Sequence, residues 1–254
     1  MKHSTASLMA CLAIAGAANA QSDRPRRVDD WGIISFETAD GEARTLRLAG
    51  IDLPRPGSPG HELAMRALDA HLAETEPVVL VTGNAGEDRY GHLVADFDLG
   101  GLTLAEAMVR NGYAIVYTWP ETRDTAIRLL PLERAAREAE LGLWGAGILA
   151  VRSPDPNNLA LYLETVQIVE GRVISVGETN DRTYLNFGFD YRSDFTVSIA
   201  QQDVQRFADA GIELASLEGR IIRVRGWLQA INGPSISINH AERIEILTPL
   251  PGPN

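Results

Sequence analysis

The sequence predicts a mainly β protein with several helices, an α+β fold built as two small β-rich domains in succession. Over most of the 254 residues, short apolar runs of strand length alternate with turns that contain Gly or Pro. The Pro- and Asn-rich stretch VRSPDPNN, residues 151–158, separates two such blocks. A hydrophobic content of 45% is enough for a core on each side. We therefore assign domains to residues 29–147 and 159–247, with a linker over 148–158.

The first 20 residues, MKHSTASLMACLAIAGAANA, predict a secretory signal peptide that is cut after Ala20. They combine a basic start, a short apolar middle and an A-x-A exit. A membrane anchor or a buried helix is a weaker alternative, because a spanning helix needs about 20 apolar residues. A further alternative is a lipoprotein acylated at Cys11. We expect export to the periplasm or outside the cell, and no membrane span in the mature chain.

The polar residues 21–28 carry no periodicity and predict a flexible leader, and residues 248–254 predict a frayed tail. The formal net charge is −11, with a single cysteine. An acidic chain is a poor candidate for strong, sequence-independent DNA binding, because such binding depends on neutralising phosphates. A local patch of arginines remains compatible with this balance.

The elements of the first block follow from its turns and caps. The Asp40–Gly41 pair predicts a hairpin between strands at 32–38 and 45–51. Thr103 with Glu106 three residues later predicts a capping box for a helix over 104–111. Apolar spacing predicts the other elements of this block: a helix from His61, strands at 78–81 and 93–97, and a helix over 126–141.

The second block predicts five strands and one helix. The strands are expected at 165–176, 183–189, 195–199, 220–231 and 235–247, and the helix at 203–210. Asn232–Gly233 marks the last turn. Three strands, a helix and two strands are the order of a five-stranded OB barrel, so we expect an OB-like second domain.

Four motifs in the first block resemble one known family. They are LRLAGIDLP from Leu46, DRYGH from Asp88, LAEAMVRNGYA from Leu104 and EAELGLW from Glu138. In this order and near this spacing they resemble the staphylococcal-nuclease-like, or thermonuclease, family over about residues 29–147. The resemblance implies a five-stranded OB barrel with three helices. It also implies calcium-dependent hydrolysis of phosphodiester bonds in DNA or RNA.

The resemblance assigns roles to individual positions. Arg47 matches the first phosphate-binding arginine, and Asp52 matches one of the two metal-binding aspartates. The other metal aspartate is matched by Ile34, and the water-activating glutamate is matched by Arg55. Two further substitutions complete the set: Leu53 stands where the family has a small or hydroxyl residue, and His92 stands at the second arginine.

These substitutions predict a degenerate site. An arginine cannot deprotonate water at neutral pH, and a single carboxylate, Asp52, is insufficient for calcium at working affinity. We therefore expect no cofactor and a noncatalytic binding or assembly module. The alternative is a divergent calcium-dependent nuclease. For the retained pair Arg47 and Asp52, two interpretations remain open: a structural ion pair, or residual phosphate binding.

Aromatic residues of the second block are interleaved with arginines. The aromatics are Tyr184, Phe187, Phe189, Tyr191, Phe195 and Trp227, and the arginines among them are Arg172, Arg182, Arg192, Arg223 and Arg225. Aromatics beside arginines on an OB barrel stack nucleic-acid bases, which favours weak binding of single-stranded nucleic acid or nucleotides. Core packing is the alternative explanation. A protein partner is equally compatible with the sequence.

Overall fold

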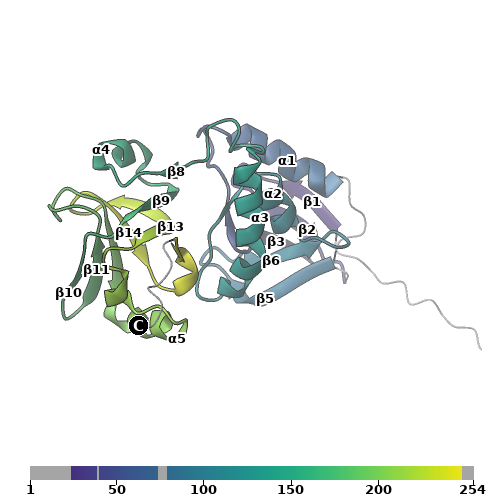
Figure 1. The fold of residues 1–254 in the computed structure, drawn as a ribbon. Helices are drawn as coiled ribbons and strands as arrows, with labels where there is room; N and C mark the ends of the chain where they lie inside the picture. Colours follow the sequence, from purple (N-terminus) through teal and green to yellow (C-terminus); the bar gives the residue numbers. More distant parts are fainter. Residues whose placement is uncertain (1–23, 39, 74–78, 248–254) are drawn as a thin grey trace, which may run out of the picture.

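The computed structural model describes residues 24–38, 40–73 and 79–247. The predicted signal peptide with Cys11 and the predicted tail therefore lie outside the described residues. The two halves of the chain lie side by side, coloured purple to teal and green to yellow (Figure 1). We call the described residues up to 150 the N-terminal half and residues 151–247 the C-terminal half.

A five-stranded sheet forms the base of the N-terminal half. Its order is β1 (Arg24–Val28), β2 (Ile34–Glu37), β3 (Ala43–Leu48), β6 (Leu93–Asp98) and β5 (Val79–Glu87). The predicted hairpin is confirmed, because β2 and β3 pair antiparallel with Ile34 opposite Leu46. A small second sheet pairs β4 (Ile51–Asp52) with β7 (Ile115–Val116). These two short strands, which were not expected as a pair, bring Asp52 beside Ile115.

Residues 24–28 form a strand, so the prediction of a flexible leader over this part is wrong. Strand β1 pairs antiparallel with β2, with a register shift between Pro25 and Arg27. Backbone hydrogen bonds at a sheet edge hold a polar segment in place without any apolar periodicity. The sequence of this strand, RPRRV, has no hydrophobic alternation that would predict it.

Three helices pack on one another beside this sheet. They are α1 (His61–Ala73), α2 (Leu104–Arg110) and α3 (Ala126–Glu138). The predicted capping box is confirmed, with Thr103 and Glu106 each accepting a hydrogen bond from the other's backbone nitrogen. The helices close a core that includes Phe36, Phe97 and Met108. Within the described ranges no helix combines the length and the apolar character needed to cross a bilayer.

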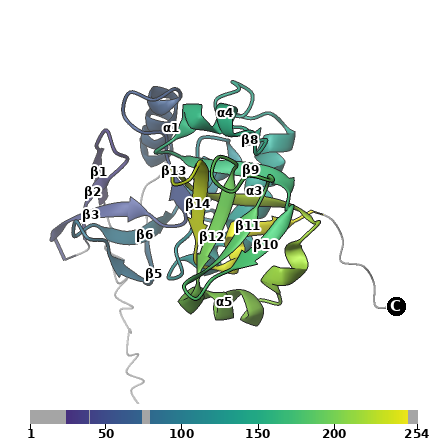
Figure 2. The same ribbon diagram turned by 90° about the vertical axis from the view of Figure 1, so that its left-hand side faces the viewer.

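A larger sheet forms the C-terminal half, seen face-on in Figure 2. Its order is β10 (Ser175–Glu178), β11 (Arg182–Asn186), β12 (Thr196–Ala200), β14 (Pro234–Ile238), β13 (Ile221–Ala230), β9 (Val166–Arg172) and β8 (Val151–Arg152), and β15 (Ile244–Ile246) also pairs with β13. Strands β12 and β14 are parallel, whereas β13 and β9 are antiparallel. The helix α5 (Val204–Asp209) follows β12, where a helix was predicted.

The predicted linker is not a plain loop. Its residues 151–152 form β8, which pairs parallel with β9. Asp155 then caps the short helix α4 (Pro156–Leu159) by accepting hydrogen bonds from the backbone nitrogens of Asn157 and Asn158. The crossing therefore belongs to the C-terminal sheet. Proline at the first position of a helix is favourable, so the Pro-rich composition that suggested a linker also starts a helix here.

An apolar cluster joins the two halves. Ile115, Tyr117 and Trp144 from the N-terminal half pack with Val166 and Ile168 of β9. Around it, the strand end at 116–118 offers main-chain oxygens to the C-terminal half. Arg243 donates hydrogen bonds to the carbonyl oxygen of Thr118, and the Thr118 hydroxyl bonds Nε2 of His240 at 2.8 Å.

A buried ion pair forms the centre of this interface. Nη1 of Arg225, on β13, donates to both carboxylate oxygens of Glu133 on α3 at 3.0 and 2.8 Å. It also donates to the carbonyl oxygen of Val116 at 3.2 Å, and Nη2 donates to Glu245 at 2.6 Å. Arg225 and Glu133 are each only 1% exposed. Burial alone would lower the pKa of Arg225, but Glu133 and Glu245 more than offset this and raise the pKa.

Replacing Arg225 by alanine should therefore lower the free energy of unfolding by about 3–5 kcal/mol, because Glu133 and Glu245 would be left buried without a counter-charge. Urea denaturation followed by circular dichroism measures the loss. Arg44→Ala is the matched control, since Arg44 pairs with Glu87 at 2.6 Å on the surface and should cost about 1 kcal/mol or less. Similar losses in the two variants would contradict a central role for Arg225.

Candidate functional site

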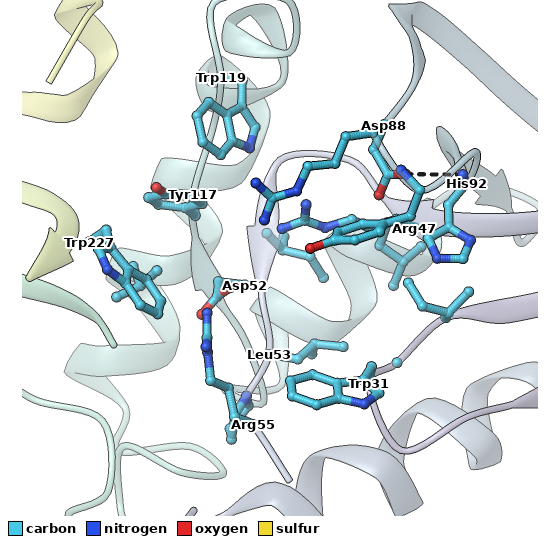
Figure 3. A pocket seen from close by; sticks show the side chains of 18 of the residues that line it. Trp31, Arg47, Asp52, Leu53, Arg55, Asp88, His92, Tyr117, Trp119 and Trp227 are labelled. Atoms are coloured by element: carbon cyan, nitrogen blue, oxygen red, sulfur yellow. Dashed lines mark hydrogen bonds between the residues drawn. The ribbon is translucent and has the colours of Figure 1, made fainter. Parts of the chain in front are cut away.

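A cavity of about 1030 Å³ lies between the two halves. The N-terminal half contributes the loop after β4 and the turn before β6. The C-terminal half contributes β13 and the segment after β14. Five of the six residues singled out from the sequence line this cavity: Arg47, Asp52, Leu53, Arg55 and His92. Figure 3 shows these side chains around the opening.

Arg47 and Asp52 face this cavity from the ends of two strands. On β3 the neighbours Leu46 and Leu48 are buried in the core, so strand alternation turns Arg47 the other way. No ion pair within 4 Å and no hydrogen bond links Arg47 to any residue in the described parts of the chain. The retained pair is therefore not a contact ion pair. The positive charge of Arg47 still acts on Asp52 at longer range and lowers the pKa of its carboxyl.

Burial dominates the chemistry of Asp52. It raises the pKa of this carboxyl to about 6, although Arg47 and Arg55 both oppose the rise. Near neutral pH the group is therefore a carboxylate that is easily protonated. A slight acidification removes its negative charge from the neighbourhood of the two arginines.

Arg55 contacts the C-terminal half. Its guanidinium carbon lies 4.1 Å from the centroid of the Trp227 ring on β13, and Figure 3 shows it extending toward Asp52 beside that ring. A guanidinium over an indole face is a favourable cation–π contact. Arg55 stands at the position where the resemblance expects a water-activating glutamate. Here its side chain instead contacts Trp227, which lies outside the segment that resembles the family.

His92 lies in a turn that Asp88 organises. Oδ1 of Asp88 accepts hydrogen bonds from the backbone nitrogens of Tyr90 at 2.9 Å and His92 at 3.0 Å. Nδ1 of His92 lies 2.8 Å from the Thr45 hydroxyl. The turn leads into β6, as its sequence predicts, and it presents Arg89 and Tyr90 to the cavity. Arg89 stacks over the Tyr90 ring, with its guanidinium carbon 4.8 Å from the centroid.

Ile34 is the exception, and the expectation that it faces the site is corrected. It is fully buried in the core of β2, whereas Trp31, Gly32 and Ile33 line the cavity. A Cβ built on Gly32 would lie 2.6 Å from Cδ1 of Leu53. Leu53 therefore occupies the space where a side chain at position 32 would point. Strand alternation on β2 thus turns Ile34 into the core, while the preceding residues 31–33 line the cavity.

The carboxylates around the cavity do not fit calcium. Asp29 and Asp88 accept backbone hydrogen bonds in their own turns, and Asp203 pairs with Arg206. Within the described ranges no three acidic, histidine or cysteine side chains gather as metal ligands. Calcium needs six to eight oxygen ligands, with several carboxylates among them. Among the described residues, Asp52 is therefore not joined by two further acidic, histidine or cysteine side chains that could hold a metal ion with it.

Several aromatic residues of the cavity were missed from the sequence. Trp31, Tyr90 and Trp119 are 64%, 70% and 44% exposed and line the cavity from the N-terminal half. Tyr117 and Trp119 meet edge to face, with ring centroids 5.5 Å apart. The alternating Tyr117–Thr118–Trp119 was the available signal, because a strand presents alternate residues on one face.

The aromatics of the C-terminal half divide between core and cavity. Phe187 and Phe195 are buried in the core, with ring centroids 5.0 Å apart. The guanidinium of Arg225 is engaged in the ion pair with Glu133 at the interface. Trp227 alone of this named group reaches the cavity. Core packing therefore explains Phe187 and Phe195, whereas Phe189 and Tyr191 are exposed away from this cavity.

A second cavity of about 500 Å³ adjoins the first on the N-terminal half. The two share eight lining residues: Arg47, Leu48, Ile51, Asp88, Arg89, Tyr90, Tyr117 and Trp119. The cationic side chains of Arg47 and Arg89 thus border open space on both sides. Aromatic rings accompany them on each side.

The raised pKa of Asp52 predicts a pH dependence of stability. An unfolded aspartate titrates near pH 4, so the folded chain binds an additional proton between about pH 4 and 6. The stabilisation from this proton is complete below about pH 4 and is lost as the pH rises through 6. Asp52→Asn should therefore gain about 2 kcal/mol relative to the wild type between pH 4 and 7.5. Urea unfolding at several pH values measures the difference.

The exposed Asp69→Asn on α1 is the control for that series and should follow the wild-type profile. Asp96 also has a pKa raised to about 6 by burial. Asp96 is present in both the wild type and Asp52→Asn, so the difference in unfolding free energy between these two proteins reports on Asp52 alone. A constant difference across the series would contradict a buried, easily protonated Asp52.

Comparison with known proteins assigns the segment that carries these residues. Residues 45–146 match the family described as Staphylococcal nuclease homologue. A probable staphylococcal-like nuclease of Oryza sativa subsp. japonica is 34% identical over 101 residues, which is 40% of this chain and 29% of the relative. An uncharacterized 38.1 kDa protein of Capnoides sempervirens is 34% identical over 108 residues, 40% of this chain and 28% of the relative.

A third relative, an uncharacterized protein of Bacillus anthracis, is 27% identical over 111 residues, which is 41% of this chain and 52% of the relative. The chain thus spans between about a quarter and a half of the length of these relatives. The family match covers β3, the cavity-lining turns and all three helices of the N-terminal half. Over residues 45–146 this chain is therefore similar to the staphylococcal nuclease homologues.

Proposed function

We propose that this protein is a noncatalytic member of the staphylococcal-nuclease-like group that binds the phosphate of a nucleotide or a single-stranded nucleic acid. The observation that carries the proposal is Arg47, which faces a large cavity without a partner among the described residues. A partly buried guanidinium that makes no contact ion pair is a good donor for a phosphate oxygen. Arg89 lies on the same wall of the cavity.

The acidic side chains support binding rather than hydrolysis. Water activation needs a base or a metal-held hydroxide. Asp52 is the one carboxylate at a matching family position that faces the cavity, and Arg55 stands where the resemblance places the base. Of the two arginines that the resemblance assigns to phosphate binding, Arg47 is retained and His92 stands at the other. The groups that would attack the phosphate are replaced.

The exposed aromatics support a nucleic-acid ligand over inorganic phosphate. Trp31, Tyr90 and Trp119 offer ring faces within reach of the same cavity as Arg47. Stacking of a base on an aromatic ring contributes about 1–3 kcal/mol for each base and tolerates any sequence. The ligand would thus combine a phosphate held by arginine with bases held by rings.

We also propose that the C-terminal half is an OB-like domain, with domain limits near 29–147 and 159–247. The order of its strands supports this, because β12 pairs parallel with β14 and β13 pairs with β9. Only residues 173–174 separate β9 from β10, although these strands lie far apart in the order of the sheet. A sheet whose far strands are joined so closely is typical of a barrel.

Export of the chain is a further part of the proposal, and it rests on the apolar run and the Ala18–Asn19–Ala20 exit. Mass spectrometry of protein recovered from the periplasm or the medium should show a chain that begins at Gln21. A lipidated Cys11 at the N-terminus would favour the lipoprotein alternative. An intact Met1 would contradict export by this route.

The binding proposal predicts two results for the purified full chain. Single-stranded DNA and RNA should remain uncut with calcium as with a chelator, as read on denaturing gels. A fluorescent single-stranded oligonucleotide should bind in the chelator with a salt-sensitive affinity, and Arg47→Ala should weaken this binding at least tenfold, because a charge-assisted bond to phosphate is lost.

Arg66→Ala is the matched control for that experiment, since Arg66 is an exposed arginine of α1 that pairs with Glu62 and lines neither cavity. It should bind within about twofold of the wild type. Calcium-dependent cleavage that Arg47→Ala abolishes would establish the nuclease alternative instead. Binding to a protein alone, with no affinity for oligonucleotides, would favour an assembly module.

A further inference from the structure

We infer that the C-terminal half forms one wall of the binding site, and that the ligand is an unpaired strand of at least two nucleotides. The inference rests on the proposed phosphate binding at Arg47. It goes beyond that proposal by adding residues outside the nuclease-like segment, and by excluding duplex nucleic acid.

The wall consists of polar and aromatic side chains that face the nuclease-like domain. Trp227, Gln229 and Asn239 line the same cavity as Arg47 and Asp52. Trp227 is half-buried and rests on Arg55, so its ring is held in place. The amides of Gln229 and Asn239 can donate and accept hydrogen bonds, as the edges of bases require. A base that enters here would meet a ring and two amides.

The arrangement of the two cavities sets the minimum length. Arg47 and Arg89 border both the larger and the smaller cavity, and Tyr90 and Trp119 do the same. A phosphate held by the arginines would therefore have room for one nucleoside on each side. A single nucleotide would leave one of the two spaces without a ligand. The arrangement fits a phosphodiester link within a strand better than a terminal phosphate.

The wall is fixed to the nuclease-like domain, which restricts what can enter. Moving it away would break the hydrogen bonds of Arg243 and His240 to Thr118 and would separate Arg225 from Glu133. An ion pair buried to this extent is costly to separate. The ligand must therefore fit between the two halves as they stand. In a duplex the base faces are covered by their neighbours, so only an unpaired strand can stack on these rings.

The test uses the full chain in a chelator and measures fluorescence anisotropy. The probes are a fluorescent single-stranded decathymidylate and a fluorescent hairpin duplex with the same number of phosphates. Thymidine monophosphate and the dinucleotide pdTpT are the competitors. The variants are Trp227→Ala, Gln229→Ala and Arg47→Ala. Phe189→Ala is the control, because Phe189 is an aromatic of the C-terminal half that is 94% exposed and does not line the cavity.

The single strand should bind at least tenfold more tightly than the hairpin, and pdTpT should compete at least tenfold better than the mononucleotide. Trp227→Ala should weaken the single strand about tenfold, and Gln229→Ala several-fold. Phe189→Ala should leave it unchanged. Circular dichroism shows whether the Trp227→Ala variant is folded. If that variant is unfolded, the affinity of Gln229→Ala for the single strand tests the wall instead.

Equal affinity for the hairpin, or equal competition by the mononucleotide, would overturn the inference. It would also fail alone if Arg47→Ala abolishes binding while both substitutions in the C-terminal wall have no effect. The proposed function fails separately if the wild type binds none of the probes, or if Arg47→Ala binds them normally.

Discussion

The architecture of this protein depends on one buried ion pair, between Arg225 of the C-terminal half and Glu133 on α3. Each partner has lost its water, and burial of an unpaired charge is far more costly than burial of a paired one. Glu245 and the carbonyl oxygen of Val116 complete the coordination of the guanidinium. The two halves therefore fit together in one arrangement, in which β13 faces the loop after β4. The cavity exists because this arrangement brings those two segments together.

Charge inside the cavity is the second constraint. The nuclease-like segment keeps the arginine that faces the opening, but one carboxylate remains beside it and burial already weakens its ionisation. Arg55 adds a second cation and uses it to contact Trp227. Two arginines thus lie near a single carboxylate. The C-terminal half contributes Trp227 to the opposite wall of the cavity.

Much of the N-terminal half could be predicted from the sequence, because its turns and caps are local. The Asp40–Gly41 hairpin and the Thr103 capping box depend on residues a few positions apart. The edge strand β1 could not be predicted, because it is held by backbone pairing with β2 and its side chains show no apolar periodicity. Asp52 and four other cavity residues were visible as motif positions. Ile34 was also a motif position, but it is buried in the core.

The rest of the site could not be predicted, because it forms between segments far apart in the chain. Trp227 looks like any strand aromatic until β13 is placed against Arg55. His240 would be expected on the surface, yet it is fully buried against Thr118. Arg225 was one of several interleaved arginines with no sign that it would be the buried one. Such roles depend on tertiary contacts across the interface, and a single sequence does not show them.

The strand end at 116–118 holds the C-terminal half largely through its main chain, since the oxygens of Val116 and Thr118 accept the hydrogen bonds from Arg225 and Arg243. Every amino acid carries that oxygen. Side chains along this short segment can therefore drift over generations without erasing the acceptors. The docking geometry then depends on the two guanidinium groups, on the carboxylates of Glu133 and Glu245, and on the Tyr117 ring that Arg243 covers at 4.0 Å.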